Sequence, residues 1–441
     1  MWGVATASYQ IEGATQVDGR GPSNWDVFSE RPGAIYQGHH AQRACEHYHR
    51  LDEDLDLLGE LNVTAYRFSV AWSRLLPQGV GAVNDAGIAF YDRLIDGLLA
   101  RSITPYLTLF HWDYPAALEE RGGFRNPRSP DWFEEFTQLV ARRYGDRVKH
   151  FLTINEPHAF IEGGLRHGRH APGLRLPLRE VLQAGHHALL CHGRATQVLR
   201  ALVPGSWIAM APVLICATPR SESSEDIAAA ERWTFSMTAP ELRSTTWWMD
   251  PVYGLGYPED GLRLFGQDAP QFSSADLDLI AQPLDAVGFN LYDAACVQAN
   301  HCGEPEICPP QPGTPRTAFN WAVSEQAHYF GPRFAHARYK GPIAITENGL
   351  SCRDWVHLDG RVHDPDRVDF LYRHLAELQR ASAEGTPIYG YFHWSLLDNF
   401  EWNHGYRERF GLSYVDYETG ERIKKDSFFA YQQLIENSRA S

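Results

Sequence analysis

The sequence predicts an α/β protein, a single (β/α)8 TIM barrel over residues 1–441 with elaborated loops at the C-terminal face of its strands. Eight short apolar or β-branched runs alternate with amphipathic stretches, which is the pattern of parallel strands joined by helices. The chain of 441 residues is long for one domain but suits a barrel, one of the folds that run large. No linker, low-complexity tract or internal repeat divides it.

The predicted strands are short runs enriched in apolar, aromatic and β-branched residues. They cover 3–9, 65–70, 105–110, 150–154, 208–215, 286–292, 342–346 and 388–394. Apolar residues return every three or four positions in the stretches between them, which predicts helices over 41–61, 85–101, 131–145, 179–202, 366–384 and 426–437. A doubly wound sheet is the rival architecture, but no glycine-rich fingerprint follows the first strand.

The region 294–330 is the longest stretch without a regular pattern, and it is rich in Pro, Gly, Cys and His. We expect it to form an elaborated loop after the sixth strand. Long loops in compact domains are usually functional.

The composition restricts the partners of the chain. It is 44% hydrophobic and contains no apolar run near the roughly 18 residues that a membrane helix requires, so no membrane partner is expected. The formal net charge of −15 disfavours nucleic acid, whose phosphates require a basic surface. A small-molecule substrate is the remaining expectation.

The seven cysteines are scattered and lack the paired spacing of zinc sites, so we expect neither a metal nor a disulfide framework. Reduced thiols and the absence of a secretory signal in the first residues favour a cytoplasmic protein. Cys302 and Cys308 share a Pro-rich loop and could form a disulfide, although two free thiols are the favoured interpretation.

Polar residues stand immediately after almost every predicted strand. Active sites of such barrels lie at the C-terminal ends of the strands, and burying these groups without partners would cost kilocalories each. A shared polar pocket satisfies them all. The residues concerned are Gln10, Glu12, Arg67, His111, Trp112, Asp113, Asn155, Glu156, His158, Asn290, Tyr292, Glu347 and Trp394.

Two of these residues, Glu156 and Glu347, are glutamates that the strand order places at the same rim. A lone glutamate at a strand end is usually half of a salt bridge, but paired carboxylates indicate glycoside hydrolysis, in which one donates a proton and the other stays ionised. We expect Arg67 and Tyr292 beside Glu347, where a positive charge and a hydroxyl would keep a nucleophile ionised and in place. Taken singly, each of these two has an ordinary structural explanation.

Other strand-end residues suit the hydroxyls and the flat faces of a sugar. Gln10, His111 and Asn155 supply hydrogen-bond donors and acceptors without acidic charge. Aromatic rings that can pack on sugar C–H groups are offered by Trp112, Trp321, Trp394 and Trp402. Tryptophans are mostly core residues, so only those at strand ends support the prediction.

Seven motifs along nearly the whole chain, in the same order, resemble those of the family 1 β-glycosidases, the β-glucosidase group of retaining glycoside hydrolases. They are ATASYQIEGA, AYRFSVAWSR, LFHWDYP, TINEP, HAPG, ITENG and WSLLDNFEW with the following GY and RFGL. The resemblance implies a (β/α)8 barrel, no metal, no cofactor, and double displacement on β-linked sugars through a covalent glycosyl-enzyme. It also implies a role in carbohydrate metabolism and cellulose degradation.

Carried over position by position, the resemblance makes Glu156 the acid/base and Glu347 the nucleophile, which Arg67 and Tyr292 position. The residues expected to bind the substrate are Gln10, His111, Trp112, Asn155, Asn290, Trp321, Trp394, Glu401 and Trp402. The chain departs from the family pattern at Leu291, at His404 and in the residues after Trp321. We expect these departures around the aglycone side, so no leaving-group preference is carried over.

The predicted function is therefore a β-glucosidase or broad β-glycosidase acting on glucosides, galactosides or fucosides. A catalytically inactive carbohydrate-binding relative is the alternative from another class, and the presence of both Glu156 and Glu347 counts against it. A phospho-β-glycosidase is disfavoured because Glu401 would place a like charge against the phosphate.

Overall fold

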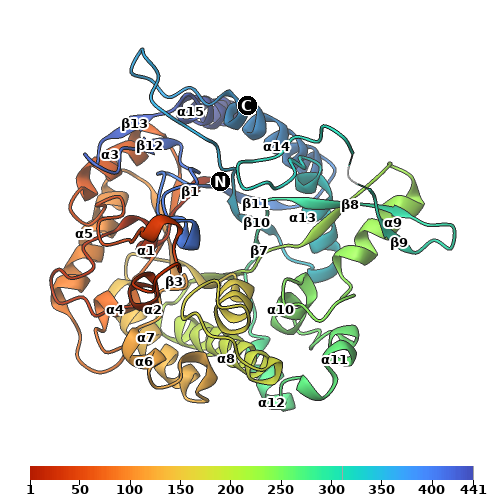
Figure 1. The fold of residues 1–441 in the computed structure, drawn as a ribbon, viewed down its shortest axis with the longest axis horizontal. Helices are drawn as coiled ribbons and strands as arrows, with labels where there is room; N and C mark the ends of the chain where they lie inside the picture. Colours follow the sequence, from red (N-terminus) through yellow and green to blue (C-terminus); the bar gives the residue numbers. More distant parts are fainter. Residues whose placement is uncertain (310, 441) are drawn as a thin grey trace.

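A ring of eight parallel strands forms the centre of the protein (Figure 1). The computed structural model describes residues 1–309 and 311–440. The strands are hydrogen-bonded in the order β5-β4-β3-β2-β1-β11-β10-β7. Their bounds are β1 (Trp2–Ala5), β2 (Ala65–Ser69), β3 (Thr104–Phe110), β4 (His150–Asn155), β5 (Trp207–Ala211), β7 (Val287–Asn290), β10 (Ile343–Asn348) and β11 (Ile388–Trp394).

The two edges of this sheet meet, because β7 is joined to the segment that follows β5. Asn290 donates its backbone N–H to the carbonyl of Pro212 at 2.8 Å, and Leu214 donates to the carbonyl of Asn290 at 2.9 Å. The predicted (β/α)8 barrel is confirmed.

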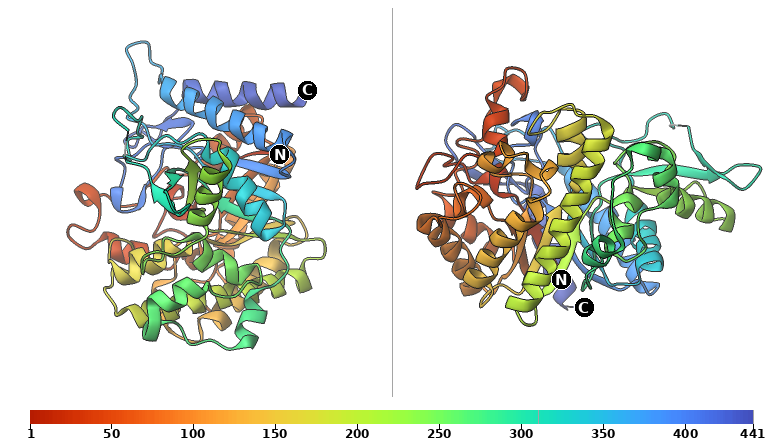
Figure 2. Two further views of the ribbon diagram at one scale, coloured as in Figure 1. Left: turned by 90° about the vertical axis from the view of Figure 1, so that its right-hand side faces the viewer. Right: turned by 90° about the horizontal axis from the view of Figure 1, so that it is seen from below.

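Helices surround the ring of strands in all three views (Figures 1 and 2). The longer ones are α3 (Leu51–Glu60), α5 (Asp85–Ala100), α7 (Ser129–Tyr144), α8 (Leu178–Leu202), α9 (Ser224–Thr234), α13 (Ala327–Tyr339), α14 (Pro365–Ala383) and α15 (Asp426–Ala440). Shorter ones are α1 (Ser8–Ile11), α2 (Asn24–Ser29), α4 (Trp72–Leu75), α6 (Ala116–Glu119), α10 (Thr245–Val252), α11 (Glu259–Phe265) and α12 (Ser274–Ile280). Their buried faces are apolar and cover the outer surface of the strands, as helical periodicity predicts.

Three elements differ from the sequence prediction. The first strand ends at Ala5, and the helical turn α1 takes over its predicted second half. Helix α3 begins only at Leu51, because residues 41–50 form turns. The predicted loop 294–330 contains two strands, β8 (Ala294–Ala299) and β9 (Pro305–Ile307), which join β6 (Cys216–Pro219) in a small separate sheet. The hairpin of β8 and β9 projects from the body of the protein at the right of Figure 1.

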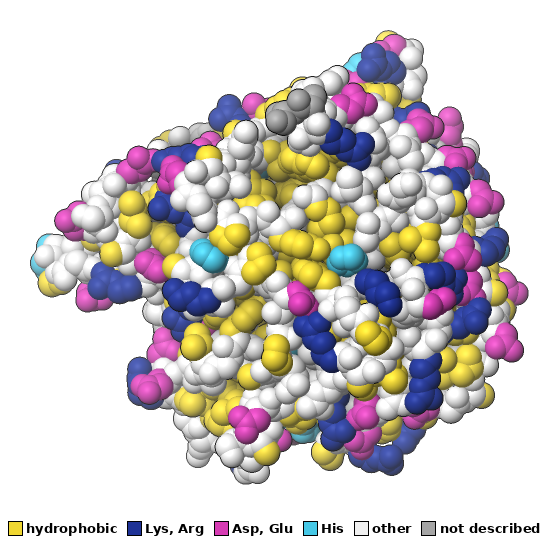
Figure 3. Space-filling view, turned by 180° about the vertical axis from the view of Figure 1, so that it is seen from behind, with side chains coloured by type: hydrophobic (Ala, Val, Ile, Leu, Met, Phe, Trp, Pro, Cys, Tyr) yellow, Lys and Arg dark blue, Asp and Glu magenta, His cyan; other side chains and the backbone are white. Residues whose placement is uncertain are grey.

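The far end of the barrel is filled by aromatic side chains. Tyr106 lies edge-on to Phe392 at 5.0 Å between ring centroids and to Trp207 at 5.5 Å, and Trp207 stacks on Tyr389 at 4.9 Å. Both chain termini lie toward this end in Figure 2, and Figure 3 shows apolar side chains at the middle of this face among charges of both signs. The barrel interior is therefore packed here, and the polar strand ends lie at the opposite face.

All seven cysteines carry free thiols, so Cys302 and Cys308 do not form a disulfide. Cys302 is exposed, whereas Cys308 is buried and its backbone N–H pairs with the carbonyl of Cys296 instead. In the described part of the chain, no helix combines the length and the apolar composition needed to cross a membrane.

Candidate active site

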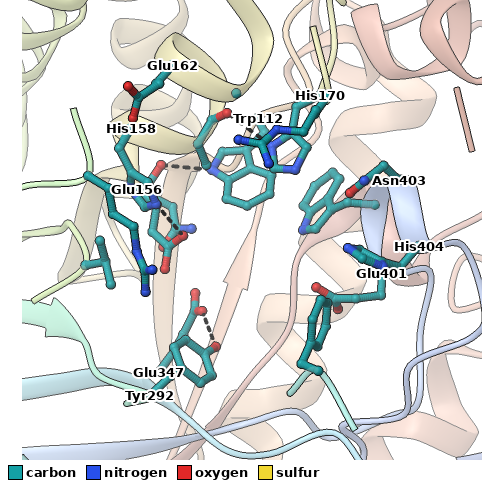
Figure 4. Close-up of a pocket in the computed structure, with 18 of the residues that line it drawn as sticks. Trp112, Glu156, His158, Glu162, His170, Tyr292, Glu347, Glu401, Asn403 and His404 are labelled. Atoms are coloured by element: carbon teal, nitrogen blue, oxygen red, sulfur yellow. Dashed lines mark hydrogen bonds and ion pairs between the residues drawn. The ribbon is translucent and has the colours of Figure 1, made fainter. Parts of the chain in front are cut away.

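A cavity of about 420 Å³ opens at the C-terminal ends of the barrel strands. Ten of the residues that the sequence predicts for the site line it: His111, Trp112, Asn155, Glu156, Tyr292, Trp321, Glu347, Trp394, Glu401 and Trp402. In Figure 4, Glu156 and Glu347 point toward one another on one side of the cavity, and Glu401 lies on the opposite side. Three carboxyl groups from distant parts of the sequence therefore share one enclosed space.

Glu347, in β10, is held at both carboxylate oxygens. Arg67 of β2 places Nη1 2.5 Å from Oε1, and the hydroxyl of Tyr292 donates to Oε2 at 2.8 Å. Burial raises the pKa of Glu347 above its ordinary value. The charge of Arg67 and the hydrogen bond from Tyr292 act in the opposite direction and reduce this rise. A guanidinium and a hydroxyl that both favour the ionised form leave Glu347 as the group in this pocket best suited to be an anion.

Arg67 also fixes the residues around it. It is fully buried, and its Nη1 and Nη2 donate to the carbonyl of Thr346 at 2.9 Å and to Oδ1 of Asn155 at 2.7 Å. Its Nε donates to the hydroxyl of Thr108 at 3.1 Å. The guanidinium thereby connects strands β2, β3, β4 and β10 beneath the cavity, which holds their ends in one arrangement.

Glu156 follows β4 directly and has a different environment. Its Oε1 accepts a hydrogen bond from Nδ2 of Asn290 at 2.8 Å, and no guanidinium forms an ion pair with it among the described residues. Burial, followed by the charge of Glu347, raises the pKa of Glu156 to about 8. At neutral pH this carboxyl group retains a proton that it can donate.

Asn155 determines which nitrogen of His111 carries the proton. Oδ1 of Asn155 accepts from Arg67, so its Nδ2 is the donor to Nε2 of His111 at 3.1 Å. Burial holds the pKa of His111 well below its ordinary value, so the ring is neutral. Nε2 then accepts, and Nδ1 carries the hydrogen; Nδ1 has no protein partner and can donate to a hydroxyl.

Glu401 and Gln10 stand together on the opposite wall. Gln10, on α1, donates from Nε2 to Oε2 of Glu401 at 3.2 Å, and its own Oε1 is buried without a partner. Burial, followed by the charges of Glu347 and Glu408, raises the pKa of Glu401 well above its ordinary value. Hydroxyls that donate to this carboxylate would restore its charge, because hydrogen bonds to the ionised form lower a pKa.

Aromatic rings form the walls between these polar groups. The ring centroids of Trp112 and Trp402 lie 4.4 Å apart. Trp394 stacks on His111 with centroids 5.7 Å apart, and Trp321 stacks on Phe319 with centroids 4.7 Å apart. Flat apolar faces beside hydrogen-bonding groups suit a ring that is apolar on its faces and polar at its edge, as a pyranose is.

Three residues that line the cavity have left-handed backbone angles. The φ angles of Trp112, Glu156 and Trp402 are 80°, 39° and 52°. Non-glycine residues adopt left-handed backbone angles at a cost of about 1–3 kcal/mol each, and such angles are concentrated at functional sites. Here the tight turns aim the three side chains into the cavity immediately after the strands or loop that carry them.

A buried group of charges, the Asp398 cluster, anchors the loop that carries Glu401. Asp398 accepts from Lys425 at 2.7 Å and from Arg409 at 2.6 Å, and Lys425 also bonds Asp354 at 2.5 Å. Arg367 completes the cluster with a bond to Asp354 at 2.8 Å. Because Asp398, Lys425 and Arg367 are buried, removing one charge of the cluster would leave its partner uncompensated, and the loop position depends on the whole cluster.

Five residues expected at the shared pocket lie behind the cavity wall. Two of them, Glu12 and Asp113, are buried and accept hydrogen bonds from Arg74 and Ser8 instead. Gln10, Arg67 and Asn290 are fully buried and reach the site through Glu401, Glu347 and Glu156 respectively. Leu291, expected near the aglycone side, is instead a buried core residue, whereas Trp321 and His404 do line the cavity.

Sequence reasoning missed part of the lining. His158 was expected at the shared pocket but was given no role, and His404 was noted only as a departure from the family pattern. Arg243 comes from an irregular segment with no pattern to mark it. The lining residues to which sequence reasoning assigned no role are His158, Ala159, Glu162, Gly163, His167, Arg169, His170, Val213, Arg243, Asp293, Phe319, Asn403, His404 and Phe410. Arg243 bonds Asp293 at 3.4 Å, and its charge lowers the pKa of Glu156. This side of the cavity is rich in histidine and carries two arginines, Arg169 and Arg243, beside two acids, Glu162 and Asp293.

Within residues 1–309 and 311–440, no group of three or more His, Cys, Asp or Glu side chains is arranged to hold a metal ion.

Comparisons with known proteins agree with this geometry. The sequence profile described as "Glycosyl hydrolase family 1" matches residues 1–440. "Beta-glucosidase A" of Thermotoga maritima is 40% identical over 99% of this chain and 97% of its own length, and "Beta-glucosidase A" of Acetivibrio thermocellus is 38% identical over the same shares. A solved structure, "Beta-glucosidase from Thermotoga maritima in complex with glucoimidazole", superposes with a TM-score of 0.90 at 40% identity, covering 99% of this chain and 98% of that one.

Proposed function

This chain belongs to glycosyl hydrolase family 1, and we propose that it is a retaining β-glucosidase in which Glu347 is the nucleophile and Glu156 the acid/base. The observation that carries the proposal is the contrast between these two carboxyl groups. Glu347 is paired with a guanidinium and a hydroxyl, whereas burial and the neighbouring charge raise the pKa of Glu156 to about 8. One group is prepared to attack and the other to donate a proton.

The reaction proceeds in two displacements. Glu347 attacks the anomeric carbon from one side while Glu156 protonates the departing glycosidic oxygen, which leaves a covalent glycosyl-enzyme and an ionised Glu156. Glu156 then removes a proton from water, which attacks the same carbon and releases Glu347. Two inversions give net retention, so the first product is the β-anomer.

The remaining polar groups bind the terminal non-reducing sugar. The free Nδ1–H of His111 donates to one hydroxyl, and Glu401 accepts from hydroxyls on the opposite edge of the ring. The free Oε1 of Gln10 supplies a further acceptor beside Glu401. Trp394 and Trp402 offer their faces to the ring, and Trp112, Asn155, Asn290 and Trp321 complete the predicted sugar site.

An inactive carbohydrate-binding relative is not supported. Such a protein has no use for a carboxylate held by Arg67 and Tyr292 opposite a second carboxyl group with a raised pKa. Both features cost stability through burial of charge, and they are explained by the chemistry.

Several finer points belong to the proposal. Residues 1–441 act as one barrel domain, which the family match over 1–440 supports. β-Linked gluco-oligosaccharides such as those derived from cellulose are substrates, and the seven free thiols support a cytoplasmic location.

The proposal is tested with 4-nitrophenyl β-D-glucoside and with cello-oligomers of increasing length. NMR of the first turnovers should show the β-anomer of glucose before mutarotation. Glu347→Gln, which keeps the size and removes the charge, should lower kcat by about 10³-fold or more. Initial release of the α-anomer, or a Glu347→Gln variant of near wild-type rate, contradicts the assignment.

A further inference from the structure

Cys296 and Cys308 stand opposite each other in the projecting hairpin. Strands β8 and β9 pair in antiparallel fashion, with Val297 opposite Ile307 and Ala299 opposite Pro305. The register continues one step beyond β9, where the N–H of Cys308 donates to the carbonyl of Cys296 at 2.8 Å. The two cysteines therefore occupy a directly opposed, hydrogen-bonded position.

This position brings the two side chains onto the same face of the hairpin. Hydrogen-bonded antiparallel pairs have Cα atoms about 5.5 Å apart, within the range of about 4.4–6.8 Å found in disulfides. Burial, together with a hydrogen bond to the Cys308 thiol, raises the pKa of Cys296 to about 12. The strand register therefore places the two free thiols opposite each other across the hairpin.

The two thiols differ in access. Cys296 is exposed, whereas Cys308 is 6% exposed. A dissolved reagent reaches the first and not the second. Cys302 is also exposed, but it lies in the turn, where its N–H is bonded to Oδ1 of Asn300 at 2.8 Å. It stands opposite neither of the other two cysteines in the strand register.

We propose that Cys296 and Cys308 form a modification site that closes to a disulfide by exchange with a low-molecular-weight disulfide. Exchange begins from the small fraction of Cys296 that is deprotonated: this thiolate attacks one sulfur of the reagent, whose S–S bond breaks and releases one small thiol. The Cys308 thiolate then attacks Cys296 Sγ in the mixed disulfide and displaces the second small thiol. The protein loses two electrons and two protons, which the reagent takes up as two thiols.

The site does not depend on the hydrolytic function, because neither cysteine lines the cavity. It also differs from the pairing considered on sequence grounds, since the partner of Cys308 is the cysteine across the hairpin and not the one in the turn.

The test uses the folded, full-length protein incubated with oxidised glutathione, followed by denaturation and alkylation of the remaining thiols. Mass spectrometry should show two fewer alkylated cysteines than the seven of the untreated protein. Glu304 and Glu306 lie between the two cysteines, so a glutamate-specific protease should yield two peptides joined by a disulfide that dithiothreitol separates.

Matched variants identify the partners. Cys302→Ser should keep the joined peptides, whereas Cys296→Ser and Cys308→Ser should lower their yield at least tenfold. Hydrolysis of 4-nitrophenyl β-glucoside shows that each variant is folded, and if the buried Cys308→Ser fails to fold, the exposed Cys296→Ser decides. Glutathione that stays attached to Cys296, or loss of the joined peptides in Cys302→Ser, overturns the proposal.

Discussion

Arg67 places Nη1 2.5 Å from Oε1 of Glu347, and both side chains are almost completely removed from solvent. A buried pair of this kind is specific about charge, because the loss of either partner leaves the other uncompensated. The pair keeps the negative charge of the pocket at Glu347, and the proton accordingly resides at Glu156, which has no guanidinium partner. The pH dependence and the variants described below follow from this division.

The first prediction concerns the leaving group. Glu156→Gln cannot donate a proton, so cellobiose hydrolysis should fall by about 10²–10⁴-fold, the usual contribution of a general acid. The phenol of an aryl glucoside with an acidic leaving group needs little protonation, so the rate of the first displacement on this substrate should fall much less. Single-turnover release of phenols of graded acidity measures the difference, and an equal loss for good and poor leaving groups contradicts the role of Glu156.

The second prediction concerns Arg243. Wild-type kcat/KM should fall as pH rises through about 8, because Glu156 then loses the proton that it must donate. The positive charge of Arg243 lowers this pKa, so Arg243→Gln should move the alkaline limb to higher pH. Arg169→Gln is the matched control, since Arg169 lines the same cavity but is not among the groups that shift the pKa of Glu156 most. A limb that stays in place in Arg243→Gln, or moves equally in both, shows that the limb has another origin.

The third prediction concerns Glu401. Hydrogen bonds to a charged group contribute about 1.5–3 kcal/mol each, so Glu401→Ala should lower kcat/KM for β-glucosides by at least about tenfold. Glu401→Gln keeps the size of the side chain and removes its charge, so its kcat/KM should lie between those of the wild type and Glu401→Ala. A 6-phosphoglucoside should be hydrolysed more slowly than the plain glucoside by the wild type, because its dianion would meet the carboxylate. Faster turnover of the phosphorylated sugar would contradict this role.

The fourth prediction concerns the Asp398 cluster. Lys425→Met leaves Asp354 and Asp398 short of a buried partner and should lower the free energy of unfolding by about 3–5 kcal/mol. The adjacent Lys424 makes a partly exposed ion pair with Glu60, so Lys424→Met should cost less than about 1 kcal/mol. Urea denaturation measures both. The fraction of Lys425→Met that stays folded should have a higher KM for glucosides, because the loop of Glu401 has lost its anchor. Equal stabilities of Lys425→Met and Lys424→Met contradict the prediction.

Much of the barrel could be predicted because its signals are local. Each strand is a short apolar run, and helices α5, α7, α8 and α14 were predicted to within two residues at each end, since their periodicity is strong. Strand β8 was missed because it pairs with β6 across a large sequence separation, and β9 was missed because it has only three residues. No local pattern records such a pairing.

The residues of the candidate site also fall into those that local sequence signals predict and those that they do not. Glu156, Glu347 and Tyr292 could be found because each stands at or directly after a strand end, where polar residues are conspicuous. Arg243 and Arg169 could not, since their place in the cavity depends on how irregular segments fold over the barrel. The left-handed φ angles of Trp112, Glu156 and Trp402 were equally out of reach, because the sequence signal for such angles is glycine.

The pairing of β1 with β11 gives the protein a particular course of synthesis. Trp2 leaves the ribosome well before its neighbour Tyr391, which is translated nearly 400 residues later. At about 5–20 residues per second, one edge of the first strand waits roughly 20–80 s for its partner. During that time it is an open edge of the kind that chaperones cover and that other nascent chains can join. Gln10 waits as long for Glu401, so this wall of the candidate site forms only after residue 401 has been translated.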